Sequence, residues 1–149
     1  MGSKARSSES VALIAEKASV SAARRFIDGA LAEEHVECDR RAEVVLIVGE
    51  LAANAIVHGS RTGDEIVVGY RLSEHRISVF VRDRAHGRSS PLVLTAAPER
   101  TSGRGLQIVD RLADWSEQIV DGYREVRAEH DLKPPTLSPD GRVRRPPTS

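Results

Sequence analysis

The sequence predicts a two-layer α/β sandwich, in which about three helices cover one face of a mainly antiparallel, mixed sheet. Two observations support this class: each helical segment carries one apolar stripe, and the extended segments alternate apolar and polar residues. The clearest alternation lies in residues 66–72 and 77–81, with a turn at Ser73-Glu74 between them, which predicts an antiparallel hairpin. A chain of 149 residues, 40% of them hydrophobic, suits one domain with a real core.

The beginning of the chain predicts a strand followed by a helix. Residues 1–9 are Ser-rich and charged, and we expect a flexible N-terminus there, with the folded domain over residues 10–131. The short apolar run 11–14 could be an edge strand or the start of a helix, and we favour a strand. Ser19 suits an N-cap for a first helix over about residues 20–33.

A second amphipathic helix is predicted over about residues 40–57. Asp39 can cap its beginning, and Gly59 stands in the usual C-terminal glycine position. At 100° per residue, three apolar positions fall within about 20° of one another, so this stripe is predicted to face the core. Its members are Leu46, Ala53 and Val57.

Glu50 and Asn54 lie one turn apart at the edge of that stripe. A carboxylate at the margin of a core can act as a general base, and an amide oxygen one turn further is a hard ligand suited to Mg²⁺. A polar i,i+4 pair on a solvated flank of the helix is the alternative interpretation.

The segment after the hairpin predicts a binding loop and a third helix. Asp83 stands where the second strand leaves the sheet, and residues 88–102 then show no usable period, as in a lid or binding loop. Gly103-Arg104-Gly105-Leu106 opens a helix that reaches about residue 113. Two glycines there would let backbone N–H groups approach a phosphate, although such a pattern is often only a tight turn.

The chain closes with a second hairpin and a tail. Residues 115–120 and 123–129 are predicted strands around an Asp121-Gly122 turn, and Trp115 is expected to anchor the core. Residues 132–149 contain five of the seven prolines and no apolar period, which predicts a disordered, basic tail.

Charge and cysteine content narrow the function classes. The net charge is zero, but residues 133–149 carry four basic and one acidic residue, which leaves 18 basic and 21 acidic residues in 1–132. This balance argues against a dedicated nucleic-acid binder. The one cysteine, Cys38, excludes an internal disulfide and a cysteine-based metal cluster. No apolar run approaches the roughly 18 residues of a membrane span, so we expect a cytoplasmic protein.

In this order of motifs, the sequence resembles the GHKL ATPase superfamily, which includes histidine kinase catalytic domains, gyrase and the MutL mismatch-repair proteins. The resemblance covers about residues 10–131 and rests on the run from Glu50 to Gly59 and on Ser102-Gly103-Arg104-Gly105-Leu106. Within the superfamily, the likeness is greatest to the small anti-sigma factor serine/threonine kinases.

The resemblance implies the Bergerat ATP-binding fold and a role for each motif. Asn54 would hold the Mg²⁺ that bridges the phosphates, and Glu50 would be the general base. Asp83 would accept a hydrogen bond from the adenine amino group. Cofactor binding would also involve the family's glycine boxes and the lid over 88–102, with Arg100 or Arg104 on the γ-phosphate. The residues expected in those boxes are Gly87, Gly103, Arg104, Gly105 and Leu106.

The resemblance also implies partners: a sigma factor and an antagonist protein that the kinase phosphorylates, with a second copy of the chain as a further candidate and with no membrane and no direct nucleic acid. One position departs from the family pattern, since Ala85 stands where the first glycine box usually has glycine. Two classes therefore stay open. The retained Glu50 favours an ATP-dependent protein kinase, and Ala85 favours a regulator that binds proteins without catalysis.

Overall fold

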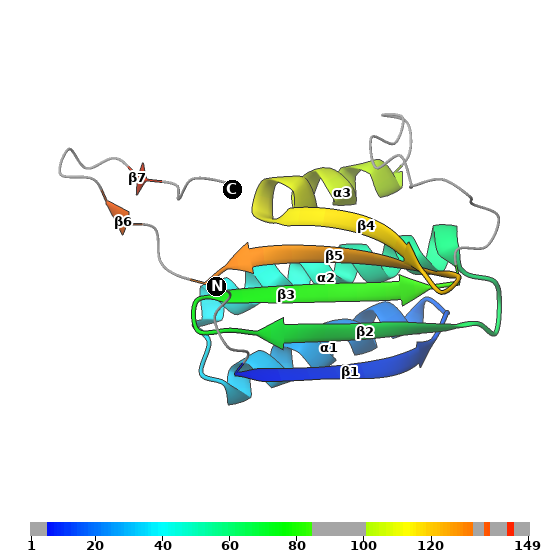
Figure 1. Cartoon of the computed structure of the whole chain (residues 1–149), viewed down its shortest axis with the longest axis horizontal. Helices are drawn as coiled ribbons and strands as arrows, with labels where there is room; N and C mark the ends of the chain where they lie inside the picture. Colours follow the sequence, from blue (N-terminus) through cyan, green and yellow to red (C-terminus); the bar gives the residue numbers. More distant parts are fainter. Residues whose placement is uncertain (1–5, 85–100, 133–135, 138–142, 145–149) are drawn as a thin grey trace.

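The computed structural model describes residues 6–84, 101–132, 136–137 and 143–144. Five longer strands and three helices make up the domain, followed by two short strands in the tail (Figure 1). In chain order they are β1 (Ser7–Ile14), α1 (Ala18–Glu33), α2 (Cys38–Gly59), β2 (Glu65–Leu72), β3 (Arg76–Asp83), α3 (Thr101–Leu112), β4 (Asp114–Val120), β5 (Tyr123–Asp131), β6 (Thr136–Leu137) and β7 (Val143–Arg144).

The five-stranded sheet has the order β1-β2-β3-β5-β4, and each neighbouring pair in it is antiparallel. The predicted antiparallel sheet is thus confirmed, without a parallel pair among the described strands. Both predicted hairpins are present: Ser73 closes the first through its N–H to the Arg76 carbonyl at 2.8 Å. Asp121 and Gly122 close the second with positive φ values of 52° and 81°, as the Asp-Gly turn predicts.

The helices lie on one side of this sheet, which confirms the two-layer sandwich. In Figure 1, α1 and α2 lie behind the strands. α3 lies beside the edge strand β4 and packs against α2. The core forms between the layers, where the alternating residues of β2 and β3 meet the helices. The strand residues predicted to face inward are all buried: Ile66, Val68, Tyr70, Leu72, Ile77, Val79 and Val81.

The orientation of α2 differs from the prediction. Leu46 is 38% exposed and Val57 is 67% exposed, so the stripe that we expected in the core faces outward. The buried arc is wide because α2 contacts β3 beneath it and both α1 and α3 beside it. Its members are Val44, Ile47, Val48, Gly49, Leu51, Ala52, Asn54, Ala55 and Gly59.

The predicted helix caps are also corrected. α1 begins at Ala18 with Lys17 as N-cap, and the Ser19 hydroxyl instead donates to the Ile14 carbonyl at 2.6 Å, which ties the helix to β1. α2 begins at Cys38 with Glu37 as N-cap, so Asp39 lies in its first turn, where an acidic side chain favours the helix dipole.

Both ends of the domain are more ordered than expected. β1 begins at Ser7, inside the segment 1–9 that we expected to be flexible, and the Arg6 N–H donates to the Leu72 carbonyl at 2.7 Å. In the tail, which we expected to be disordered, β6 and β7 pair with each other. Trp115 packs against the core while half-buried, and its indole N–H donates to Asp110 at 3.1 Å.

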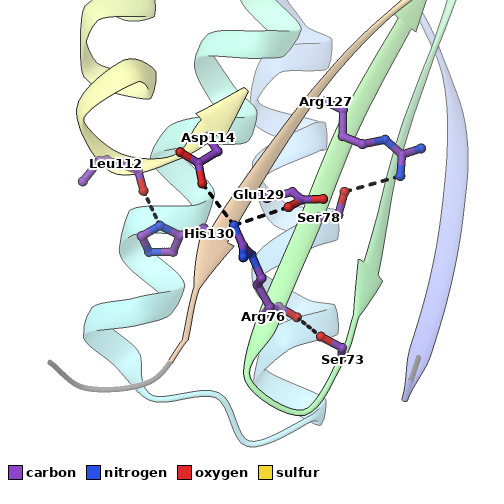
Figure 2. A network of polar contacts seen from close by, with 8 residues as sticks. All are labelled: Ser73, Arg76, Ser78, Leu112, Asp114, Arg127, Glu129 and His130. Carbon is purple, nitrogen blue, oxygen red and sulfur yellow. Dashed lines mark hydrogen bonds and ion pairs between the residues drawn. The ribbon is translucent and has the colours of Figure 1, made fainter. Parts of the chain in front are cut away.

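Charged side chains line the sheet face that the helices leave open. Phe80 lies against Gly69, and the guanidinium carbons of Arg82 and Arg127 lie 4.9 and 5.3 Å from the centre of its ring. Figure 2 shows Arg127 also reaching Ser78, at 3.5 Å, and Arg76 bridging Asp114 and Glu129 at 3.1 and 3.3 Å. These contacts pair most of the positive charge on this face with carboxylates or an aromatic ring.

By length and composition, α2 could cross a membrane, although its sequence has no uninterrupted apolar run of that length. Half of the relevant window is buried inside the fold. In this structure α2 is the central helix of the core, between α1 and α3.

Candidate functional site

The site is built first on the second half of α2, where Glu50 and Asn54 lie one turn apart. Asn54 is 4% exposed, and neither its amide nitrogen nor its amide oxygen has a hydrogen-bond partner within the described part of the chain. Buried amide groups are almost always paired, so an unpaired one indicates a missing ligand or water. Glu50 is only half-buried, which leaves its carboxylate at the margin of the core, as predicted.

The neighbouring glycine fixes how α1 approaches this turn. Gly49 is buried against α1, and a Cβ at this position would overlap the Arg24 guanidinium. Arg24 therefore lies across the backbone immediately before Glu50. Arg24 is exposed on α1, and only the packing of the two helices shows its closeness to the candidate base.

Asp83, the last residue of β3, is 1% exposed and forms an ion pair with Arg124 of β5. Its Oδ2 accepts hydrogen bonds from Arg124 Nε, at 3.0 Å, and from Arg124 Nη2. The two residues are direct partners in the β3–β5 register, so the sheet itself brings them together. The carboxylate expected to recognise adenine is thus already bound by a guanidinium.

Gly59 explains how α2 reaches Asp83. α2 ends at Gly59, as predicted, but the φ of Gly59 lies outside the left-handed region that a C-terminal glycine usually adopts. A Cβ at Gly59 would overlap the Asp83 carboxylate. Glycine is therefore needed here for close approach, and it joins the end of the Glu50-to-Gly59 motif to the end of β3.

Arg124 is the residue that sequence reasoning missed. It is 1% exposed, and its Nε lies 3.8 Å from Glu117 Oε1 of β4, while its Nη1 has no hydrogen-bond partner among the described residues. The signal was available in the period of β5, because Arg124 shares the helix-facing side with Val126 and Ala128, two buried apolar residues. An arginine in an otherwise apolar register position indicates a buried partner.

The second glycine box lies inside α3. This helix begins at Thr101, whereas we expected it to open at Gly103 and to follow a loop over 88–102. Only the first four residues of an α-helix have N–H groups without an intrahelical acceptor, so Gly103 and Arg104 qualify but Gly105 and Leu106 do not.

Several expected site residues lie outside the described residues. These are Gly87 and Ala85 of the first glycine box, Arg100, and the proposed lid up to residue 100. The elements on either side of them are placed: β3 ends at Asp83, and α3 starts at Thr101 and packs against α2.

The donor set at Asn54 fits Mg²⁺ bound through phosphates. The described residues contain no group of three or more His, Cys, Asp or Glu side chains that could hold a metal ion by themselves. Magnesium in nucleotide sites takes one or two protein ligands and completes its shell with phosphate oxygens and water. A buried amide oxygen without a partner meets that requirement.

Comparison with known proteins agrees with this geometry. The family model of the histidine kinase-like ATPase domain matches residues 13–129. This range contains the helices and the five-stranded sheet, except for the first residues of β1 and the end of β5. No curated protein sequence matches the chain. The family match spans most of the sequence, and its fold is the antiparallel sandwich described above. The chain therefore belongs to the family of histidine kinase-like ATPase domains.

Proposed function

We propose that this protein is an ATP-dependent protein serine/threonine kinase that acts as an anti-sigma factor: it binds a sigma factor and phosphorylates a protein antagonist of that interaction. The observation that carries the kinase proposal is the buried, unpaired amide of Asn54 one turn after a half-buried Glu50. A structural core gains nothing from an amide without partners, whereas a metal–phosphate site uses its oxygen. The anti-sigma role is supported by the motif resemblance alone.

Each residue has a distinct task in this reaction. Asn54 would hold Mg²⁺, which would supply neutralisation of the phosphate charge. Glu50 takes the proton from a serine hydroxyl of the antagonist. The hydroxyl oxygen then forms a bond with the γ-phosphorus, the bond from that phosphorus to the β,γ-bridging oxygen breaks, and ADP leaves. The partial exposure of Glu50 supports this assignment because the acceptor serine belongs to another protein.

A second candidate is a regulator that binds partner proteins without phosphoryl transfer. The Asp83–Arg124 pair favours it, since the carboxylate expected to contact the base already accepts two hydrogen bonds. In that case ATP would bind weakly or serve only to stabilise the fold. The two candidates differ in whether transfer occurs, and both place protein partners on this domain.

Two variants of the full chain test the kinase proposal. Calorimetry with ATP and Mg²⁺ measures binding, and transfer of labelled γ-phosphate to serine-containing candidate antagonists measures catalysis. We expect Asn54→Ala to lose the Mg²⁺-dependent part of binding. We expect Glu50→Gln to bind ATP within about threefold of the wild type and to lose transfer, because a general base acts only in the transition state.

The outcomes separate the candidates. If Glu50→Gln lost ATP binding as completely as Asn54→Ala, the base assignment would be wrong. A wild type that binds Mg²⁺-ATP but transfers phosphate to no candidate would favour the binding-only regulator. A wild type that binds no ATP at millimolar concentration would contradict the nucleotide site itself.

A further inference from the structure

The outward side of α2 is apolar on both sides of Glu50. Leu46, one turn before Glu50, is 38% exposed, and Val57, two turns after it, is 67% exposed. Ala42 and Ala53 share this side, because the four apolar residues lie within about 60° of one another around the helix. We call these four residues the outer stripe of α2. Exposed helix faces usually carry polar side chains, so this stripe suits contact with another protein.

Arg24 of α1 lies at the border of the outer stripe. A Cβ on Gly49 would overlap the Arg24 guanidinium, which therefore lies against the α2 backbone one residue before Glu50. Arg24 is exposed, and neither Arg24 nor Glu50 forms a hydrogen bond or an ion pair with another described residue. The surface beside the candidate base thus carries a positive charge that no carboxylate of the described residues balances.

Arg24 and the phosphate end of the site lie on opposite sides of Glu50. Around α2, Glu50 is about 40° from Asn54 and about 100° from Gly49 in the other direction. In phosphoryl transfer the attacking and leaving oxygens are roughly in line, so the acceptor approaches from the side away from the departing ADP. With the phosphates at Asn54, that side is the one with the outer stripe and Arg24.

We propose that Arg24 and the outer stripe of α2 form the docking surface for the acceptor segment of the protein substrate, and that Arg24 selects a segment with a carboxylate side chain next to the acceptor serine. This inference rests on the proposed kinase function. A guanidinium binds a carboxylate through charge-assisted hydrogen bonds, and apolar side chains beside the serine cover Leu46 and Val57. Arg24 has no part in the transfer step itself.

The test uses two fluorescein-labelled peptides in which leucine and alanine surround a serine, with either Glu or Gln immediately before that serine. Fluorescence anisotropy measures their dissociation constants with the full-length protein and Mg²⁺-ADP, which cannot donate a γ-phosphate. We expect the wild type to bind the Glu peptide about five times more tightly, because the Glu carboxylate contacts Arg24. This preference should shrink at high salt, which screens exposed charges.

The arginine is tested by two charge-matched variants. Arg24→Ala leaves the Glu50 carboxylate to repel the Glu peptide, so we expect the preference for that peptide to disappear or to reverse. Arg25→Ala is the control, because Arg25 is also exposed on α1 but lies about 160° around the helix from the buried Ile27. This control should keep the wild-type ratio of dissociation constants.

The outer stripe is tested separately. Val57→Ser removes exposed apolar surface and should weaken both peptides by the same factor, so the ratio persists. Ile14→Ser, at a side chain of β1 that is 54% exposed, is the matched control and should change neither dissociation constant. Equal affinity of the wild type for the two peptides would overturn the proposal. So would a wild type that binds neither peptide, or a preference that Arg24→Ala leaves unchanged.

Failure of the proposed kinase function gives a different result. Calorimetry with Mg²⁺-ATP on the same wild-type protein measures the nucleotide site independently of the peptides. A wild type that binds no Mg²⁺-ATP would overturn the kinase function and, with it, this proposal. Normal binding of Mg²⁺-ATP together with equal peptide affinities would overturn the docking proposal alone.

Discussion

Two buried polar clusters connect α2 to β5, one at each end of the strand, and they are built on different principles. The first consists of Asp83 and Arg124, with Asn54 five residues before the Gly59 that meets Asp83, and three polar atoms of Asn54 and Arg124 are buried without hydrogen-bond partners among the described residues. The second centres on His130, which is 7% exposed. Its ring has a partner at each nitrogen.

The His130 cluster is a closed structural contact. Nδ1 lies 2.5 Å from the Leu112 carbonyl, at the last residue of α3, as Figure 2 shows. Nε2 lies 2.6 Å from Glu43 of α2, and Glu43 also accepts from Arg40 at 3.2 Å. The two atoms that the ring contacts are a backbone carbonyl oxygen and a carboxylate oxygen.

The hydrogen bonding of buried polar groups can distinguish a contact that only stabilises the fold from a candidate ligand site. A cluster that only stabilises the fold should satisfy every group, because each unpaired buried donor or acceptor costs free energy. A ligand site keeps some groups unpaired until the ligand arrives. Asn54 and Arg124 each have buried polar atoms without a hydrogen-bond partner among the described residues, whereas both ring nitrogens of His130 have one.

The largest expected effect comes from breaking the ion pair of the first cluster. Asp83→Ala leaves the Arg124 charge buried with Glu117 as its remaining carboxylate among the described residues, so we expect the free energy of unfolding to fall by about 3–5 kcal/mol. Urea unfolding measures it. Asp114→Ala is the matched control, because its pair with Arg76 at 3.1 Å is exposed and should contribute less than about 1 kcal/mol. Equal losses would show that burial does not distinguish the two pairs.

Removing the His130 side chain should lower the free energy of unfolding by a smaller amount. His130→Ala removes two hydrogen bonds and leaves the Leu112 carbonyl and Glu43 without the ring, for which we expect a loss of about 2–3 kcal/mol. ATP affinity should stay within about twofold, since this cluster lies at the other end of β5. His75→Ala, on an exposed turn, should change stability by less than about 0.5 kcal/mol. Loss of nucleotide binding in His130→Ala would contradict the separation of the two clusters.

Glu125 lies between the clusters on the open face of β5 and gives a pH-dependent effect. Burial alone would raise the pKa of its carboxyl, but hydrogen bonds from Arg82 and Gln118 and the charge of Arg127 outweigh burial and hold the pKa below its ordinary value. A lowered pKa stabilises the fold above the unfolded-state pKa, and this contribution is lost as the pH falls through the folded-state pKa.

The stability difference between wild type and Glu125→Gln should therefore be largest near neutral pH and shrink below about pH 4. Urea unfolding between pH 3 and 7 measures this difference. Glu129→Gln, at a half-exposed side chain that pairs with Arg76, should show a smaller change across the same range. A difference for Glu125→Gln that is constant with pH would mean that the carboxylate charge does not contribute.

The smallest change in the free energy of unfolding is expected at Asn54. Asn54→Ala removes two buried, unpaired polar atoms, and that gain offsets the lost packing. We expect the free energy of unfolding without nucleotide to change by no more than about 1 kcal/mol, in a core position that is 4% exposed. A loss of 3 kcal/mol or more in thermal or urea unfolding would show that Asn54 has a structural partner.

The alternation of apolar and polar residues predicted the sheet correctly, but the helical period predicted the wrong inward face for α2. Ile66 and Val79 are buried as alternation required, because a strand has only two faces and one of them is apolar. α2 is apolar around most of its circumference, so three residues such as Leu46, Ala53 and Val57 could not select its inward side. Contacts with α1, α3 and β3 selected another arc, in which glycine and alanine allow close approach.

The order of elements, the two hairpins and the one-turn spacing of Glu50 and Asn54 could be predicted from the residues alone, since these depend on short-range period and turn chemistry. The neighbours of each side chain depend on the three-dimensional fold. Asp83 meets Gly59 and Arg124 across gaps of 24 and 41 positions in the chain, and the β3–β5 register together with the close approach of α2 creates that meeting. The strength of an electrostatic interaction depends on the distance between two groups in space, and the local sequence does not give that distance.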